Sequence, residues 1–370
     1  MLTYSILLFS WHEYLNRRLF MLSLEIETKE IKMKLRTTIL EYLRLFRFHA
    51  VSMETTIILI GALIMGQRDL LLLFIIFLIG FFGHICGYVL NDYADLEVDK
   101  KSHELKEKPL VSGIIPKNNA LIVAFITALF SYILVFIFFQ NLQTILFLGL
   151  ATVLTILYNF YGKKIPGSDV IVAGTIVVFF FMSASSLSMP LTNLVYIVGL
   201  ILFFDIVFIN IVEGGLKDVD HDYLSGARTL ATVTGVKVKD GKLITTGKFL
   251  AIAYTIRAIY IFMIILLGFE PKINIWLSNS YSSIIVEVIA IIFIILVLFG
   301  SYKFLSLKVF DRSKMKRLYG GINAASGVLY IVMLFPILGL EITLFLLLFP
   351  VTWYTLFNTI LYGKPMQPRV

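Results

Sequence analysis

The sequence lacks a second cysteine, a soluble domain and a low-complexity segment. Cys86 is the only cysteine among 370 residues, so an internal disulfide is excluded and the redox compartment is left open. No stretch has the composition of a soluble domain, and no connection between apolar stretches is longer than the one at 212–248. The chain therefore has to be interpreted through its apolar stretches.

A secretory signal peptide is not indicated either. The first eleven residues, MLTYSILLFSW, are too short to span a membrane, lack a basic start and show no small-residue cleavage site. We expect residues 1–35 to form a cytoplasmic, poorly ordered N-terminal extension. In residues 35–49, helical spacing places apolar side chains on one side and Arg44 and Arg47 towards another, which predicts an interfacial helix before the first span.

Long apolar runs are what the chain has in abundance. Its hydrophobic content is 59% and its mean hydropathy is +0.90, against roughly 45–50% apolar residues in soluble domains. A helix needs about 20 apolar residues to cross a bilayer. The candidate spans are 50–66, 70–90, 120–139, 144–158, 170–189, 194–211, 249–268, 284–302 and 320–338. The sequence therefore predicts an all-α, multi-pass membrane protein with nine transmembrane helices.

A tenth helix is also possible from the pattern, because residues 342–361 form another apolar stretch after a short break. We interpret residues 36–340 as the main transmembrane domain and residues 341–370 as an additional hydrophobic helix and tail.

The distribution of basic residues predicts how the chain is oriented. The loops after the even-numbered spans hold nineteen Lys and Arg residues, whereas those after the odd-numbered spans hold only Arg68 and Lys272. Basic loops stay in the cytoplasm. The even-numbered loops and the N-terminus are therefore expected to be cytoplasmic. This pattern accounts for most of the net charge of +8, so no nucleic-acid partner is needed to explain it.

Two of these basic loops are also rich in aspartate. The second span is followed by NDYADLEVDKKSHELKEKPLVSG, and the sixth by EGGLKDVDHDYLSGARTLAT. Each holds aspartates at i and i+4, on one face of a helix, where like charges repel. A magnesium ion would remove that repulsion, since it prefers carboxylate ligands. The candidate metal ligands and catalytic residues are Asp92, Asp95, Asp99, Asp218 and Asp222.

Each acidic group is followed by a basic residue and a leucine, in Lys108-Pro109-Leu110 and Arg228-Thr229-Leu230. Aspartate-bound magnesium can bridge to a diphosphate while Lys or Arg contacts the remaining oxygens. Because the protein lies in a membrane, the rest of such a substrate would be a lipid. An isoprenoid diphosphate meets both requirements.

These motifs carry a resemblance to a known family. Asn91–Asp99 (NDxxDxxxD), with the later KPLxxG, resembles the first signature of the UbiA superfamily of intramembrane prenyltransferases. Asp218–Leu230 (DxxxDxxxGxxTL) resembles the second, and Tyr158–Lys163 (YNFYGK) resembles the family's tyrosine-to-lysine motif. The resemblance covers about residues 36–340.

The resemblance implies a helical bundle around a central cavity that opens to the bilayer and is capped by the cytoplasmic loops. It implies magnesium-assisted departure of diphosphate from a prenyl donor, with two ions bridging the diphosphate, and capture of the carbocation by a lipid or aromatic acceptor. The expected substrate-binding residues are Asn91, Lys108, Tyr158, Tyr161, Lys163, Arg228 and Arg257.

The acceptor is predicted from a single position. After Leu230 the chain has Ala231, where the ether-lipid branch of the superfamily tends to have proline. This favours an aromatic ring in quinone-type lipid synthesis, and the alternative is geranylgeranylglyceryl phosphate in archaeal ether-lipid synthesis. Outside the class, a transporter with an acidic cytoplasmic vestibule remains an alternative, although transporters typically carry ionisable residues near mid-membrane.

The sequence departs from the family pattern at two site positions. Lys108 stands where arginine is more frequent, and Gly214 stands where many members have a polar or acidic residue.

Several polar residues inside the spans leave two interpretations open. Arg257 either faces the cavity near the diphosphate or extends towards the interface. Asp205 either faces the cavity or pairs with Arg257, and His84 is more typical of a packed polar residue than of a ligand. Asn159 and Asn210 are candidates for lining the cavity.

Overall fold

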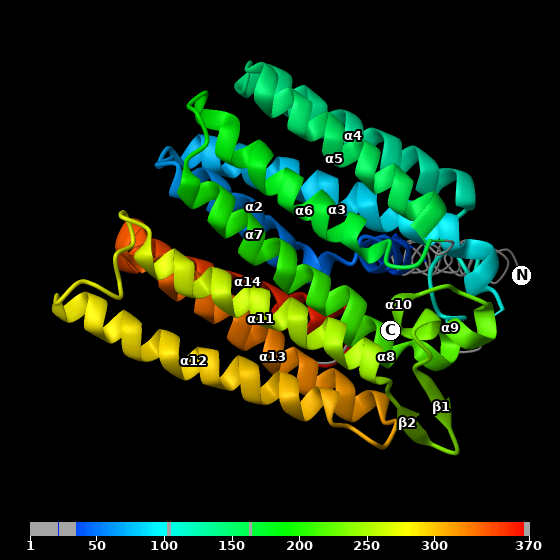
Figure 1. The fold of residues 1–370 in the computed structure, drawn as a ribbon. Helices are drawn as coiled ribbons and strands as arrows, with labels where there is room; N and C mark the ends of the chain where they lie inside the picture. Colours follow the sequence, from blue (N-terminus) through cyan, green and yellow to red (C-terminus); the bar gives the residue numbers. More distant parts are fainter. Residues whose placement is uncertain (1–20, 22–34, 102–104, 163–164, 366–370) are drawn as a thin grey trace, which may run out of the picture.

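The structure is a computed structural model that describes residue 21 and residues 35–101, 105–162 and 165–365. Its long helices run alongside one another in one bundle, with a β-hairpin at one end (Figure 1). The long helices are α2 (Val51–Ile64), α3 (Leu70–Asp99), α4 (Lys117–Phe138), α5 (Leu142–Tyr161), α6 (Asp169–Ala184), α7 (Asn193–Val207), α11 (Gly247–Phe269), α12 (Tyr281–Leu305), α13 (Arg312–Met333) and α14 (Phe335–Tyr362). The short elements are η1 (Phe48–Ala50), η3 (Ser185–Leu187), η4 (Phe208–Gly214), α8 (Gly215–Lys217), α9 (Val219–Ser225), α10 (Leu230–Val233), β1 (Lys237–Lys239) and β2 (Lys242–Ile244).

Eight of the described helices are long and apolar enough to cross a membrane. A ninth results where Leu35–Leu45 and Phe48–Ile64 are taken as one span with a bend of 51°. α13 is a further helix of 22 residues at the predicted ninth span, and its first turns are basic. The predicted all-α, multi-pass membrane bundle is confirmed.

Side chains at the helix starts explain where several helices begin. An N-cap side-chain oxygen that accepts a hydrogen bond from a backbone N–H of the first turn stabilises a helix start. Five long helices have such a cap three residues before the donor N–H. The capping residues are Asp69, Asn141, Thr246, Ser280 and Asp311.

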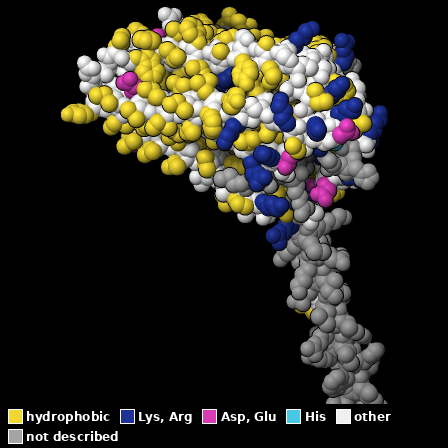
Figure 2. All heavy atoms as spheres, turned by 60° about the horizontal axis from the view of Figure 1, so that its bottom comes forward, with side chains coloured by type: hydrophobic (Ala, Val, Ile, Leu, Met, Phe, Trp, Pro, Cys, Tyr) yellow, Lys and Arg dark blue, Asp and Glu magenta, His cyan; other side chains and the backbone are white. Residues whose placement is uncertain are grey.

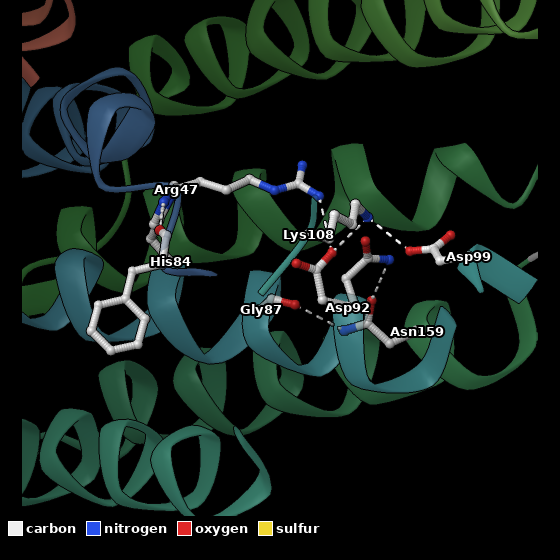
Figure 3. A network of polar contacts seen from close by, with 9 residues as sticks. Arg47, His84, Gly87, Asp92, Asp99, Lys108 and Asn159 are labelled. Atoms are coloured by element: carbon white, nitrogen blue, oxygen red, sulfur yellow. Dashed lines mark hydrogen bonds and ion pairs between the residues drawn. The ribbon is translucent and has the colours of Figure 1, made fainter. Parts of the chain in front are cut away.

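The corner before α2 determines where one basic side chain points. The predicted helix before the first span is present as Leu35–Leu45. The chain then turns at Arg47, whose φ and ψ are both 45°, in the left-handed region that residues other than glycine rarely adopt. This turn directs the Arg47 side chain towards the end of α3 (Figure 3).

The candidate tenth stretch, residues 342–361, lies within α14, which is one of the eight membrane-length helices. α14 lies against η1, α2 and α13. Trp353 Nε1 donates a hydrogen bond to the carbonyl of Phe48 at 2.8 Å, and Arg44 Nη2 donates to that of Leu361 at 2.9 Å. α14 therefore holds the corner before α2 from both sides.

The surface separates into an apolar part and a charged end. Figure 2 shows hydrophobic side chains over most of one face, with Lys and Arg gathered towards the end that carries α9 and the β-hairpin. Large apolar side chains such as Phe125 and Ile295 are more than half exposed, which carries no penalty against lipid tails. One end of the bundle is therefore basic, as the loop charges predicted.

Candidate active site

The first acidic group lies on the last turns of α3, which continues unbroken to Asp99. Asp92 and Asp99 are two helical turns apart, so their side chains lie on the same face. Both are buried, at 5% and 6% exposure. A buried carboxylate has to be paired or neutralised, because removing its charge from water is costly. The structure therefore brings two of the predicted metal ligands together in a place that requires a cation.

Lys108 and Arg47 supply positive charge to this face. Lys108 Nζ lies 3.0 Å from Asp92 Oδ1 and 2.8 Å from Asp99 Oδ2. Arg47 Nη2 lies 3.3 Å from the same Asp92 oxygen, so the two basic side chains converge on one carboxylate (Figure 3). Arg47 was placed on an interfacial helix by sequence and not among the site residues. The acidic first signature and the corner before α2 therefore meet here.

The donor set suits magnesium, although the described residues hold no group of three His, Cys, Asp or Glu side chains that could bind a metal by themselves. Magnesium is usually held by one or two carboxylates together with substrate phosphates. Asp92 and Asp99 meet that need, since oxygens of both reach a single cation, the Lys108 ammonium. These two residues therefore fit a metal whose other ligands come from a diphosphate.

The second acidic group lies on a broken stretch of helix. α7 widens into the π-helix η4, α8 follows, and α9 carries the aspartates. The i, i+4 pair is helical, since the backbone N–H of Asp222 donates to the carbonyl of Asp218 at 2.9 Å. α9 ends at Gly226, whose φ of 71° is the left-handed conformation that glycine adopts freely.

Basic neighbours also contact this second group. Lys217 Nζ lies 3.0 Å from Asp218 Oδ2. Arg312, from the start of α13, lies 2.7 Å from Asp220 Oδ1. Asp220 is the aspartate that the DxxxD motif does not include. Its partner, Arg312, belongs to a helix that is distant in the sequence.

The two acidic groups lie at the same end of the bundle. Figure 1 places the end of α3, α9 and the β-hairpin together at that end. Tyr158, near the end of α5, interacts electrostatically with Asp95 of the first group and with Asp222 of the second. Both groups therefore lie at the end of the bundle where α5 carries Tyr158.

A cavity of about 270 Å³ extends from this end into the bundle. Its polar and small lining residues come mainly from α3 and α5, and apolar residues of α2 and α6 complete the wall. The lining is Arg47, Glu54, Ile58, Gly80, Gly83, His84, Gly87, Tyr88, Asn91, Thr155, Tyr158, Asn159, Val172, Thr175, Ile176, Phe179 and Asn210. From Asn91 to Gly80 the lining of α3 covers about 16 Å along its axis, at 1.5 Å per residue.

Amide side chains fasten α3 to α5 at the mouth of this cavity. Asn91 Nδ2 donates to Asn159 Oδ1 at 3.3 Å, and Asn159 Nδ2 donates to the carbonyl of Gly87 at 3.3 Å (Figure 3). Asn159 and Asn210, proposed from sequence as cavity residues, both line it.

The other expected substrate-binding residues are placed differently. Tyr161 is 53% exposed at the end of α5, Arg228 is exposed between α9 and α10, and Lys163 lies outside the described residues. Neither Tyr161 nor Arg228 is among the lining of the described cavity. Their contact with a substrate stays a prediction.

Arg257 is buried in the interior at 2% exposure, away from the lining of the described cavity. Its Nη1 lies 3.2 Å from Asp205 Oδ1 and 3.3 Å from Ser326 Oγ, and its guanidinium lies 3.7 Å from the ring centre of Phe208. The pairing with Asp205 that the sequence suggested is therefore present, and Arg257 does not extend to the interface. Its contact with a diphosphate stays a prediction.

Sequence reasoning missed a polar cluster deeper in the cavity. Tyr88 Oη donates to Glu54 Oε1 at 2.8 Å, and His84 Nδ1 lies 3.0 Å from Glu54 Oε2. His84 is packed, as expected, at 4% exposure, yet it also lines the cavity. A signal existed in the sequence, because Glu54 is the only charged residue of the 50–66 stretch and an ionisable residue inside a span is a candidate for function.

Comparison with solved structures supports the fold. A UbiA homologue from Aeropyrum pernix K1 superposes with a TM-score of 0.59 at 15% identity, over 78% of this chain and 97% of that one. A UbiA homologue from Archaeoglobus fulgidus bound to GPP and Mg²⁺ gives a TM-score of 0.55 at 18% identity, over 79% and 99%.

Sequence comparison finds two kinds of relative. The digeranylgeranylglyceryl phosphate synthase of Pyrococcus furiosus is 26% identical over 260 residues, covering 68% of this chain and 84% of that protein. The 4-hydroxybenzoate octaprenyltransferase of Shewanella pealeana is 39% identical over 88 residues, covering 24% of this chain and 30% of that protein. The profile of the UbiA prenyltransferase family matches residues 55–308. Since that match covers more than half of the sequence, the chain belongs to the UbiA prenyltransferase family.

Proposed function

We propose that the protein transfers a prenyl group from an isoprenoid diphosphate to a membrane-associated acceptor, in a magnesium-dependent reaction at the cytoplasmic end of the bundle. The observation that carries this proposal is the buried Asp92–Asp99 pair, bridged by Lys108 at the mouth of a cavity that runs into the bundle. The charged group suits a diphosphate, and the adjoining cavity suits the hydrocarbon chain attached to it.

The charged end would hold the diphosphate. Asp92, Asp95, Asp99, Asp218 and Asp222 would hold magnesium, which supplies electrostatic stabilisation of the charge that develops on the leaving diphosphate. Lys108 and Arg47 already point at this face, and their donors would contact phosphate oxygens that the metal does not take. The homologue from Archaeoglobus fulgidus bound to GPP and Mg²⁺ supports both the donor class and the ion.

The cavity would hold the prenyl chain. Apolar side chains such as Ile58, Ile176 and Phe179 line it, and three glycines of α3 leave room along its length. Such a wall excludes water, which would otherwise react with the carbocation. The residues thus separate a polar leaving-group site from an apolar chain site.

For the acceptor, we propose an aromatic ring, on the evidence of Ala231 after Leu230. The octaprenyltransferase of Shewanella pealeana is a relative of this kind. The second candidate is geranylgeranylglyceryl phosphate, which is supported by the more extensive match to the synthase of Pyrococcus furiosus.

The test uses membranes that contain the protein, a radiolabelled prenyl diphosphate, and a panel of aromatic and glycerol-phosphate acceptors. We expect one acceptor class to yield a labelled lipid, with loss of all product in excess EDTA and recovery with added Mg²⁺. Turnover that persists in EDTA contradicts the metal assignment, and the absence of product with every acceptor contradicts the proposed function.

A further inference from the structure

The cluster of Glu54, His84 and Tyr88 has no role in the donor site. Glu54 comes from α2 and the other two from α3, and all three line the cavity. The Glu54 carboxylate joins them, because Tyr88 Oη and His84 Nδ1 each contact one of its oxygens. The His84 side chain is fully buried, whereas that of Glu54 is 26% exposed. Glu54 and the partly exposed Tyr88 are therefore the members of the cluster that a molecule in the cavity can reach, and of these two the carboxylate is the one that serves as a base.

Counting hydrogens shows that this cluster holds a movable proton. His84 Nε2 lies 3.0 Å from the backbone carbonyl of Phe46, which only accepts, so Nε2 carries a hydrogen. A second proton lies between His84 Nδ1 and Glu54 Oε2. It is either on His84 Nδ1, facing a carboxylate, or on Glu54, facing a neutral imidazole ring. Either arrangement keeps the contact of 3.0 Å.

The cluster can also accept one more proton without breaking its contacts. A proton added to Glu54 Oε1 would donate to Tyr88 Oη, because a phenol hydroxyl both donates and accepts. The hydroxyl would rotate and the oxygens would stay at hydrogen-bonding distance, 2.8 Å apart.

The cluster lies next to the donor site, further into the cavity. Tyr88 and His84 precede Asp92 on α3 by one and two turns, which is about 6 and 12 Å along the axis. Arg47 links the two sites, since its guanidinium lies 4.4 Å from the ring centre of Tyr88 and contacts Asp92 at 3.3 Å. A prenyl group attached to a diphosphate at Asp92 would enter the cavity beside Glu54.

We propose that Glu54 accepts the proton that the acceptor loses during prenyl transfer, with His84 and Tyr88 positioning its carboxylate. This inference rests on the proposed function. The donor's C–O bond breaks and diphosphate leaves with the electron pair, while a bond forms between the prenyl carbon and the acceptor. The acceptor's proton passes to Glu54 and then to solvent. An aromatic C–H and an alcohol O–H each release one proton, so the role holds for both acceptor classes.

A purely structural ion pair explains the cluster less well. Charged groups inside a membrane are costly, and replacing a buried pair with apolar residues is often neutral or stabilising. The helices α2 and α3 already pack closely at Gly80, where an added Cβ would lie 2.8 Å from Ile58 Cδ1. Their contact does not need a glutamate that faces the cavity.

The first experiment compares Glu54→Gln with Glu287→Gln, which changes a carboxylate of α12 outside the lining of the described cavity. General-base catalysis typically contributes about 10²–10⁴-fold, so we expect kcat of Glu54→Gln to fall at least about a hundredfold. Its donor KM, and its magnesium-dependent affinity for a non-hydrolysable prenyl thiodiphosphate, should stay within about threefold of wild type. Glu287→Gln should keep wild-type turnover.

A second variant keeps the proposal testable if the glutamine variant misfolds. Glu54→Ala should regain part of its turnover when formate is added, because a small carboxylate can occupy the vacated volume and accept the proton. Tyr88→Phe should lower kcat less than Glu54→Gln, since it removes a positioning hydroxyl only.

The inference is overturned if wild type makes product and Glu54→Gln keeps its kcat, if the loss appears in donor binding instead of kcat, or if formate leaves Glu54→Ala unchanged. A wild-type protein that makes no product with any acceptor overturns the proposed function, and this inference with it. The two failures are therefore distinguishable by the wild-type assay.

Discussion

The two acidic groups have the same sequence spacing but different backbones. Asp95 and Asp99 are on one continuous helix of 30 residues, and Asp99 is buried. Asp218 is the N-cap of the seven-residue helix α9 and Asp222 lies within it, after the π-helix η4 and the short α8, and the Asp218 side chain is 44% exposed. Equal spacing therefore does not mean equal rigidity. The first group is preorganised by α3, and the second is on a segment that can adjust.

Breaking the first group should have the largest effect. Asp92→Asn removes a charge that contacts both Lys108 and Arg47, and we expect prenyl transfer to fall about 10²–10³-fold, the range for losing a preorganised electrostatic group. The control is Glu97→Gln, because the Glu97 side chain is 72% exposed and pairs with the surface residue Lys100. Turnover assays at saturating Mg²⁺ measure both, and equal losses would contradict the distinction between the two faces of α3.

The second group should respond less. We expect Asp222→Asn to lower turnover about tenfold to a hundredfold, since a charge-assisted contact contributes about 1.5–3 kcal/mol. Asp220→Asn should cost less than about threefold, because Asp220 pairs with Arg312 in a partly exposed ion pair of small net value. The Mg²⁺ concentration for half-maximal activity should rise only for Asp222→Asn. Similar behaviour of both variants would assign the metal role to α9 as a whole.

Arg228 provides a finer comparison within the second segment. If it contacts the diphosphate, Arg228→Ala should weaken turnover about tenfold, the effect of roughly 1.4 kcal/mol. Lys237→Ala removes a charge from β1 that is also exposed and should leave turnover unchanged. Both variants are assayed in parallel at matched protein levels. If they behave alike, Arg228 contributes only to the orientation of its loop and does not contact the diphosphate.

The smallest effect on activity is expected from single-cysteine variants made for labelling. They test whether the loops that carry the two acidic groups face the same side of the membrane. Single cysteines at Ser112 and Thr245, in a Cys86→Ala background, should leave activity near wild type. Both should react with a membrane-impermeant thiol reagent only after the cells are opened. Reaction of either one in sealed cells would place its loop outside and separate the two groups.

The comparison also shows what the sequence could predict. The spans were predictable because an apolar stretch of about 20 residues has few alternatives to a membrane helix. The second span was predicted as 70–90, whereas α3 continues to Asp99, because the polar turns keep helical hydrogen bonds outside the apolar stretch. The aspartate pairs were predictable from local spacing on one helix.

Other features depend on contacts between distant segments. Glu54 and His84 are 30 positions apart, and Arg47 and Asp92 are 45 apart, so no local pattern links them. The left-handed turn at Arg47 is not marked in the sequence by a glycine. These contacts follow from how α2 packs on α3, which sequence spacing alone does not specify.

The contacts of α14 have a consequence for biosynthesis. Trp353 and Leu361 hold the two sides of the corner that presents Arg47, and α14 follows every other described helix in the sequence. It therefore leaves the ribosome after the helices that bear the aspartates. We expect nascent chains that have inserted all earlier helices to remain inactive until α14 docks.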